Sequence, residues 1–145
     1  PEPKVAILSA VETVNPKIQS TLDAAALCKM ADRNQIKGGL LDGPLAFDNA
    51  VSIVAAKTKG INSAVAGRAD ILVVPDLESG NMIAKQLEYL ANALGAGIVL
   101  GARVPIVLTS RADTAETRIA SCVIAALVAH ANRAKKTSGM TSPMP

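Results

Sequence analysis

The sequence predicts an α/β fold with a mainly parallel sheet flanked by helices. Aliphatic runs alternate with amphipathic segments along residues 5–133 of the 145-residue chain, and this alternation is typical of βαβ units. Hydrophobic residues make up 50% of the chain but aromatic residues only 1%, so the core must consist of Ala, Val, Ile and Leu. Such a core suits parallel strands that helices cover on both faces. The length is sufficient for a domain with a core of its own.

The first half of the chain contains two predicted strands and two predicted helices. An aliphatic run predicts the first strand, and Asn15 as N-cap with Pro16 in the first helical position predicts the start of the first helix. Gly60 is a suitable C-terminal stop for the second helix. In chain order, we expect a strand at 5–10, a helix at 16–33, a strand at 36–42 and a helix at 47–57.

The second half continues the alternation and ends in an apolar helix. In chain order, we expect a strand at 70–75, a helix at 79–94, strands at 96–101 and 104–109, and a helix at 113–133. The last helix is apolar on nearly all sides between Ile119 and Ala129, which in a chain of this length favours an interface with another domain or subunit. Residues 136–145 are small, polar or Pro and are predicted to be a disordered tail.

Composition argues against several classes of function. The net charge is +3, but part of the excess lies in Arg133, Lys135 and Lys136, which predict a solvated end of the chain and no nucleic-acid surface. The scarcity of aromatic residues also argues against binding of single-stranded nucleic acid. No stretch has the roughly 18 consecutive apolar residues of a membrane span, and the first residues are not typical of a signal peptide. We therefore expect neither a nucleic acid nor a membrane as a partner.

The set of metal-binding and nucleophilic side chains is small. The single histidine, His130, argues against a multi-histidine metal site and a histidine-based catalytic triad. Cys28 and Cys122 have no partners at metal-binding spacing and lie among apolar neighbours in predicted helices. Buried, reduced thiols of this kind predict a cytoplasmic protein, and we expect no metal ion.

The turn that carries Ser110 and Arg111 is the most informative segment for function. A short β-branched run at 104–108 ends there, and the last predicted helix begins shortly afterwards. A strand-to-helix turn of this kind points free backbone N–H groups outward, beside an Arg guanidinium and a Ser hydroxyl. Together these groups can bind an anion such as phosphate. A plain turn with a surface arginine also explains the same residues.

Two pairs of charged residues have ordinary structural explanations. Asp113 and Glu116 have the spacing of a capping box, in which Asp113 caps the helix and Glu116 reaches back. The alternative is that a carboxylate beside the anion site acts as a general base. Lys85 and Glu88 are three residues apart on one predicted helix and are interpreted as a surface ion pair.

Polar and glycine residues follow two other predicted strands, at the edge of a parallel sheet where ligands bind. Gly80 allows a close approach to the backbone and the Asn81 amide can donate to a ligand, while capping by Asp76 or Ser79 is the structural alternative. Asp42 and Gly43 are interpreted as a turn after the second strand, with a ligand contact as the alternative.

Four segments carry a resemblance to a known family: VAILSAVETVNPK (5–17), LLDGPLAFDNA (40–50), AGRADILVVPDLESGN (66–81) and PIVLTSRADTAETR (105–118). They are similar, in order and in spacing, to segments of the phosphate acetyl/butyryltransferase family, and together they cover residues 4–133. The residues of the first and last segments look more like those of the butyryl branch, or like those of the phosphotransacylase part of proteins joined to an enoyl-CoA hydratase-like region.

The resemblance implies the reversible exchange of a short acyl group between CoA and inorganic phosphate, which are substrates, with no metal or redox cofactor. It implies a cytoplasmic homodimer with two α/β subdomains in an isocitrate/isopropylmalate dehydrogenase-like architecture. The chain resembles only the C-terminal half of such an enzyme, with residues 1–103 as one subdomain and residues 104–135 as the final strand and helix of the companion subdomain. We therefore expect the chain without an N-terminal half to be inactive or nearly so.

The resemblance also assigns roles to residues. Ser110 and Arg111 match the pair that contacts the reacting phosphate and the CoA thiol. Thr117 stands where the acetyl branch has an Asp proposed as the base, so Glu116 or Asp113 substitutes, the base lies elsewhere, or water takes the proton. The catalytic candidates are Ser110, Arg111 and Glu116, and the substrate-binding candidates are Asp113, Thr117, Asp76, Gly80, Asn81, Asp42 and Gly43.

Two other functions are alternatives to the transferase. The first is a degenerate, transferase-like module that serves dimerisation or scaffolding without catalysis. The second is a decarboxylating dehydrogenase of the related two-domain kind, which needs a metal-binding cluster, and Asp42, Asp48 and Asp76 lack an obvious spacing for one. The sequence therefore predicts the phosphate acyltransferase first.

Overall fold

The computed structural model describes residues 2–139, with side chains up to residue 134. By its internal contacts the chain divides into two compact units, with the boundary between Met82 and Ile83. These are the N-terminal unit and the C-terminal unit. Helix α4 (Leu77–Ala91) contains the boundary.

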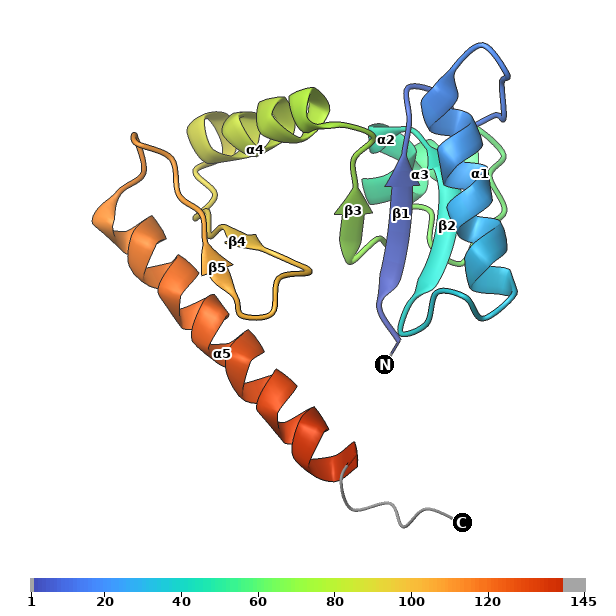
Figure 1. The fold of residues 1–145 in the computed structure, drawn as a ribbon. Helices are drawn as coiled ribbons and strands as arrows, with labels where there is room; N and C mark the ends of the chain where they lie inside the picture. The colour runs from blue at the N-terminus through green and yellow to red at the C-terminus, as the bar shows by residue number, and fades with distance from the viewer. Residues whose placement is uncertain (1, 140–145) are drawn as a thin grey trace, which may run out of the picture. The chain divides into compact units, whose positions relative to one another are not determined.

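A three-stranded parallel sheet forms the centre of the N-terminal unit (Figure 1). Its strands are β1 (Lys4–Leu8), β2 (Leu40–Leu45) and β3 (Ile71–Val73), in the order β2-β1-β3. Because β1 has a neighbour on both sides, its last four side chains are buried and supply much of the core. The predicted α/β class with a parallel sheet and flanking helices is confirmed.

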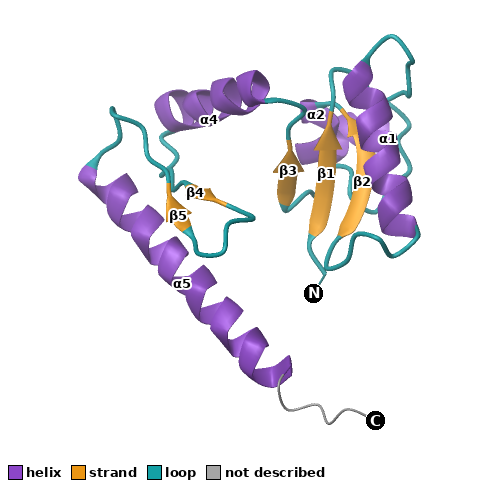
Figure 2. Ribbon diagram, in the orientation of Figure 1, coloured by secondary structure: helices purple, strands orange, loops and turns teal. Residues whose placement is uncertain are grey.

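Helices cover this sheet. α1 (Gln19–Asp32) packs against β2 and β1, and α2 (Phe47–Val51) with α3 (Ile53–Thr58) lies behind the sheet in the view of Figure 2. The helix expected at 47–57 is therefore two helices. Ser52 divides them, because its backbone is extended and its hydroxyl accepts a hydrogen bond from the Ala55 N–H at 3.3 Å, which caps α3.

The start of α1 differs from the prediction. The helix begins at Gln19, and Asn15 is not its N-cap. The Asn15 side chain instead accepts from the Lys17 N–H at 3.0 Å, which forms a local turn. The fully buried Thr21 hydroxyl fixes this turn, since its oxygen accepts from the Asn15 N–H at 2.9 Å and lies 2.7 Å from the Ile18 carbonyl oxygen.

Asp42 and Gly43 do not form a turn after the second strand. They lie inside β2, where one extra residue bulges between the pairs Ala6–Asp42 and Leu8–Leu45. A Cβ at Gly43 would lie 2.6 Å from the Ile7 carbonyl oxygen, so only glycine lets the two strands approach here. The predicted turn was wrong. Glycine stands at position 43 because β2 lies close to β1 there, and not because the chain turns.

The two cysteines differ in their surroundings. Cys28 on α1 is half-buried, and its thiol donates to the Gly43 carbonyl oxygen at 3.6 Å. Burial, together with the negative charges of Asp42 and Asp32, raises the pKa of the Cys28 thiol to about 11. Cys122 is exposed, so the expectation of two buried thiols was wrong for this residue.

The C-terminal unit contains a two-stranded hairpin and a long helix (Figure 1). β4 (Ile98–Val99) and β5 (Ile106–Val107) are antiparallel, and α5 (Ala115–Gly139) packs against both. Both strands were predicted, but the sequence pattern did not give their antiparallel pairing. The connection between them is too short for a parallel crossover, which needs about a dozen residues.

The predicted subdomain boundary at residues 103 and 104 stays a prediction. β4 belongs with β5 and α5, because it pairs with the first and contacts the second. α5 continues to Gly139, so residues 136–139 of the predicted tail are helical. Residues 140–145 of that tail lie outside the described residues.

Large apolar side chains of α5 remain exposed. Ile119 is 65% exposed, Val123 53% and Leu127 64%. This agrees with a helix whose apolar surface exceeds what the C-terminal unit can cover. No helix within residues 2–139 combines the length and hydropathy that a membrane crossing requires.

The buried Thr21 hydroxyl makes a testable contribution to stability. Thr21→Val keeps the shape of the side chain but leaves the Asn15 N–H without its acceptor. We expect the free energy of unfolding to fall by about 1–3 kcal/mol. Urea denaturation followed by circular dichroism measures this loss. The exposed Thr13 of the same loop is the control, and equal losses for Thr13→Val and Thr21→Val would contradict the assignment.

Candidate functional site

The ten candidate residues fall into two groups, one in each unit. Asp42, Gly43, Asp76, Gly80 and Asn81 belong to the N-terminal unit. The other five belong to the C-terminal unit, where the structure brings them together around the start of α5. They are Ser110, Arg111, Asp113, Glu116 and Thr117.

Most residues of the first group make structural contacts within the N-terminal unit. Asp76 accepts from the Ser79 N–H at 2.7 Å at the start of α4, and hydrogen bonds from Ser79 hold the pKa of Asp76 below its ordinary value. A Cβ at Gly80 would lie 2.9 Å from a methyl group of Val74, so the glycine allows α4 to approach β3 and its continuation. Asn81 is exposed.

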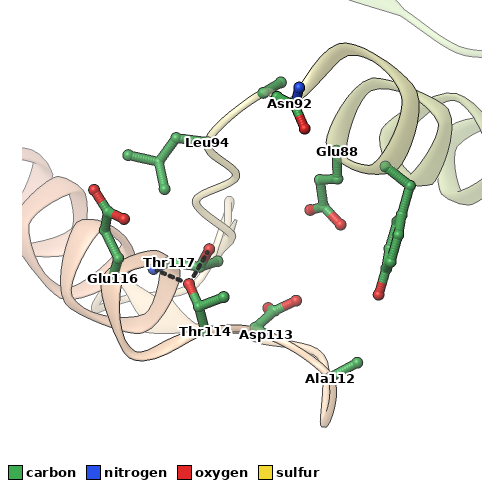
Figure 3. Close-up of a pocket in the computed structure, with 10 residues that line it drawn as sticks. Glu88, Asn92, Leu94, Ala112, Asp113, Thr114, Glu116 and Thr117 are labelled. Atoms are coloured by element: carbon green, nitrogen blue, oxygen red, sulfur yellow. Dashed lines mark hydrogen bonds between the residues drawn. The ribbon is translucent and has the colours of Figure 1, made fainter.

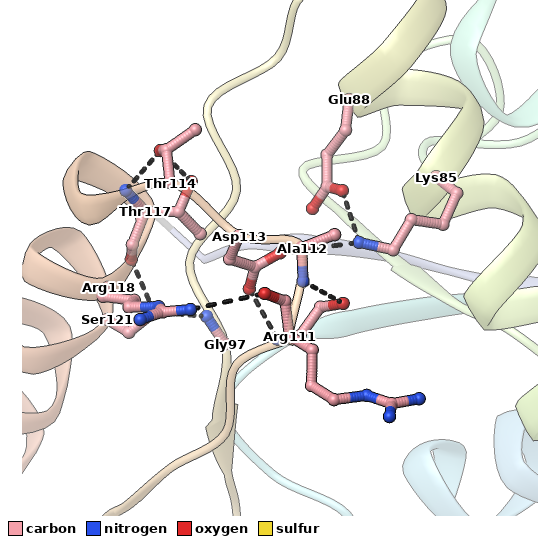
Figure 4. A network of polar contacts seen from close by, with 11 residues as sticks. Lys85, Glu88, Gly97, Arg111, Ala112, Asp113, Thr114, Thr117, Arg118 and Ser121 are labelled. Carbon is pink, nitrogen blue, oxygen red and sulfur yellow. Dashed lines mark hydrogen bonds and ion pairs between the residues drawn. The ribbon is translucent and has the colours of Figure 1, made fainter.

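The turn after β5 is closed by its own hydrogen bonds. The Ser110 N–H donates to Asp113 Oδ2 at 2.6 Å, and the Asp113 N–H donates to the Ser110 carbonyl oxygen at 3.2 Å (Figure 4). The Ala112 N–H points to Ser110 Oγ at 3.4 Å. The expectation of free, outward N–H groups was therefore wrong for these three residues, because the Asp113 carboxylate occupies the position that an external anion would take.

Thr114, and not Asp113, caps α5. The Thr117 N–H donates to Thr114 Oγ1 at 3.2 Å, which is the usual contact between an N-cap and the third helical residue. The predicted capping box was wrong, since Asp113 faces the turn. Glu116 is exposed and has no hydrogen bond or ion pair with the residues that the structure describes.

Asp113 has a second partner that the sequence did not reveal. Its Oδ1 lies 3.6 Å from Nζ of Lys85, and the same ammonium donates to Glu88 Oε2 at 2.6 Å (Figure 4). The hydrogen bond with Glu88 raises the pKa of Lys85, against the opposing effect of burial. Lys85 and Glu88 are therefore more than a surface ion pair, because they continue to a carboxylate that is only 10% exposed.

The Arg111 guanidinium is available to an anion. Its side chain is exposed and points away from the other labelled side chains of the turn (Figure 4). Within residues 2–139 it forms no ion pair, while its carbonyl oxygen accepts from Arg118 Nη2 at 3.4 Å. A fixed backbone with an unpaired guanidinium suits contact with a phosphate.

A pocket of about 590 Å³ lies between the end of α4 and the start of α5, within the C-terminal unit (Figure 3). Glu88, Asp113 and Glu116 give it an acidic lining, so it does not attract a phosphate by itself. The other lining residues are Tyr89, Asn92, Ala93, Leu94, Ala112, Thr114 and Thr117. Among the described residues, no group of His, Cys, Asp or Glu is arranged to hold a metal ion.

Ser121 fixes α5 to the hairpin and was also missed from the sequence. Its buried hydroxyl donates to the Thr117 carbonyl oxygen at 2.8 Å and accepts from the Gly97 N–H at 3.0 Å. The serine stands in an apolar helical run, where sequence alone gives no sign of a contact with a distant strand.

Comparison with known proteins gives consistent matches. A family model described as phosphate acetyl/butaryl transferase matches residues 1–126. The phosphate acetyltransferase of Rhizobium meliloti is 67% identical over 139 residues, which are 96% of this chain and 44% of that protein. The phosphate butyryltransferase of Clostridium acetobutylicum is 54% identical over 127 residues, 88% of this chain and 42% of that protein. Relatives of both names, acetyltransferase and butyryltransferase, therefore match most of this chain.

Solved structures agree. A branched-chain phosphotransacylase from Enterococcus faecalis V583 has a TM-score of 0.76 and 38% identity, over 88% of this chain and 46% of that one. A phosphotransacetylase from Streptococcus pyogenes has a TM-score of 0.70 and 32% identity, over 88% of this chain and 39% of that one. The chain thus spans less than half the length of these relatives. It belongs to the phosphate acetyl/butyryltransferase family.

Proposed function

We propose that a protein carrying this chain is a phosphate acyltransferase, which reversibly transfers a short acyl group between CoA and inorganic phosphate. The observation that carries the proposal is the exposed Arg111 guanidinium, without an ion pair among the described residues, on a turn that Asp113 holds closed. The names of the relatives, acetyltransferase and butyryltransferase, support this reaction. CoA and phosphate act as substrates, and the reaction as written needs no metal or redox cofactor.

The proposed chemistry is a direct acyl transfer. A CoA thiolate attacks the carbonyl carbon of the acyl phosphate, a C–S bond forms, and the bond between that carbon and the phosphate oxygen breaks. Arg111 stabilises the charge that grows on the phosphate oxygens. The Ser110 hydroxyl donates to the developing oxyanion or to the thiol.

Glu116 is the proposed base that takes the thiol proton. Asp113 is a poor candidate, because its two oxygens already meet the Ser110 N–H and Lys85 and the side chain is only 10% exposed. Thr117 has no acid–base group and contacts Thr114. Glu116 lines the pocket, is exposed, and keeps its lone pairs for a substrate.

The rest of the enzyme is proposed to lie outside this chain. An N-terminal half, or its equivalent, would cover the exposed apolar side chains of α5, with residues 104–135 completing the companion subdomain. A homodimer in the cytoplasm is the proposed state of the whole protein. In the N-terminal unit, Asn81 remains the proposed substrate contact, while Asp42, Gly43, Asp76 and Gly80 have the structural contacts described above.

The first test asks whether this chain supplies half of an active enzyme. In a hybrid enzyme, this chain replaces the matching segment of 139 residues in the Rhizobium meliloti phosphate acetyltransferase. We expect thioester formation from acetyl phosphate and CoA by the hybrid enzyme, and almost none by the 145-residue chain alone. Normal turnover by the chain alone would refute the proposed division of the site.

Arg111→Ala tests the phosphate contact. In the hybrid enzyme we expect kcat/KM to fall by about 10²–10³, because one donor to the transition-state charge is lost. Arg68→Ala is the matched control, since Arg68 is an exposed arginine of the N-terminal unit with no proposed role. If the two variants have the same activity, the transferase assignment loses its chemical basis and a non-catalytic module becomes the better explanation.

Glu116→Gln tests the base. The amide keeps the size of the side chain but cannot take a proton, so we expect kcat of the hybrid enzyme to fall by about 10²-fold. Glu78→Gln, on the exposed first turn of α4, serves as control. A Glu116→Gln enzyme with wild-type kcat would assign the proton to another group.

A further inference from the structure

Asp113 links α4 to the turn that carries Arg111. One of its oxygens accepts from the Ser110 N–H at 2.6 Å, and the other lies 3.6 Å from Lys85 Nζ. The side chains of Asp113 and Lys85 are 10% and 35% exposed. A carboxylate with so little access to water depends on its protein partners for compensation of its charge.

Lys85 differs in this respect from an otherwise similar lysine. Lys29 also forms an ion pair with a residue three positions later, Asp32, at 2.7 Å. Those two side chains are 69% and 63% exposed, and no third residue joins them within the described part of the chain. Lys85 contacts Glu88 at 2.6 Å and, in addition, the nearly buried Asp113.

We propose that Lys85 is a positioning residue for the phosphate-binding turn, which acts on Arg111 through Asp113 and the Ser110 backbone. Glu88 holds the lysine, the lysine holds one oxygen of Asp113, and the other oxygen fixes the Ser110 N–H (Figure 4). The inference rests on the proposed function, because it assigns the phosphate contact to Arg111.

Loss of the lysine has a specific consequence. Without Lys85 the negative charge of Asp113 is uncompensated in a site that is 90% hidden from water, since its side chain is 10% exposed. The carboxyl group then turns toward solvent, and its hydrogen bond with the Ser110 N–H weakens. The backbone of Arg111, the next residue, is then less firmly held. We therefore expect the affinity for the phosphate group to fall while the affinity for CoA is unchanged.

The kinetic experiment uses the hybrid enzyme with Lys85→Met, Lys85→Arg and the control Lys29→Met. We expect Lys85→Met to raise the KM for acyl phosphate by about tenfold, as for a small misplacement of a binding group, with the KM for CoA unchanged. Lys85→Arg keeps the positive charge and should restore most of the affinity. Lys29→Met should behave as wild type.

A double-mutant cycle shows whether Lys85 acts through Asp113. If it does, Lys85→Met added to Asp113→Asn changes the KM for acyl phosphate no further than Asp113→Asn alone. Independent, multiplicative effects would overturn the proposed linkage. A loss of thermal stability in Lys85→Met, with both KM values and kcat unchanged, would show a merely structural lysine and would also overturn it.

A second measurement needs no activity. In the 145-residue chain, hydrogen exchange of the Ser110 amide by NMR reports its bond with Asp113, and we expect faster exchange in Lys85→Met but not in Lys29→Met. Unchanged exchange would refute the inference. If Arg111→Ala is silent, the proposed function fails, whereas if Arg111→Ala is severe and Lys85→Met is silent, only the role of Lys85 fails.

Discussion

The hydrogen bond between the Asp113 carboxylate and the Ser110 N–H is the interaction on which the candidate site depends. It places a fixed negative charge where a strand-to-helix turn would otherwise receive an external anion. In the proposed function a side chain therefore contacts the phosphate, and the Arg111 guanidinium projects from this turn. Asp113 lines the acidic pocket, whereas Arg111 is not among the residues that line it.

Much of the fold could be predicted because it follows from local pattern. The aliphatic runs at β1 and β3 and the helical periodicity of α1 predicted the parallel sheet and its cover. The predictions were wrong where the local structure depends on a contact with a residue far away in the sequence. Gly43 has the sequence of a turn, yet the Ile7 backbone requires it inside a strand. The sequence shows that the link between β4 and β5 is short, but the predicted lengths of the two strands did not indicate that they pair antiparallel.

The candidate site was predicted in part. Ser110 and Arg111 were predicted as site residues because a strand end, a hydroxyl and a guanidinium occur together in the sequence. The contact between Lys85 and Asp113 was not predicted. The i, i+3 pair with Glu88 already explains the lysine locally, and Asp113 lies far along the chain from it. Thr114 and Asp113 are both good caps, and only the competing bond to Ser110 decides between them.

The exposed apolar side chains of α5 couple the folding of the C-terminal unit to the binding of any surface that covers them. Ile119, Val123 and Leu127 stay hydrated until another surface covers them, and each square ångström then covered contributes about 25 cal/mol. Any chain that binds this helix only in its folded form adds to the stability of the C-terminal unit by mass action. If such a chain is present, the resistance of the C-terminal unit to unfolding therefore rises with the concentration of that chain.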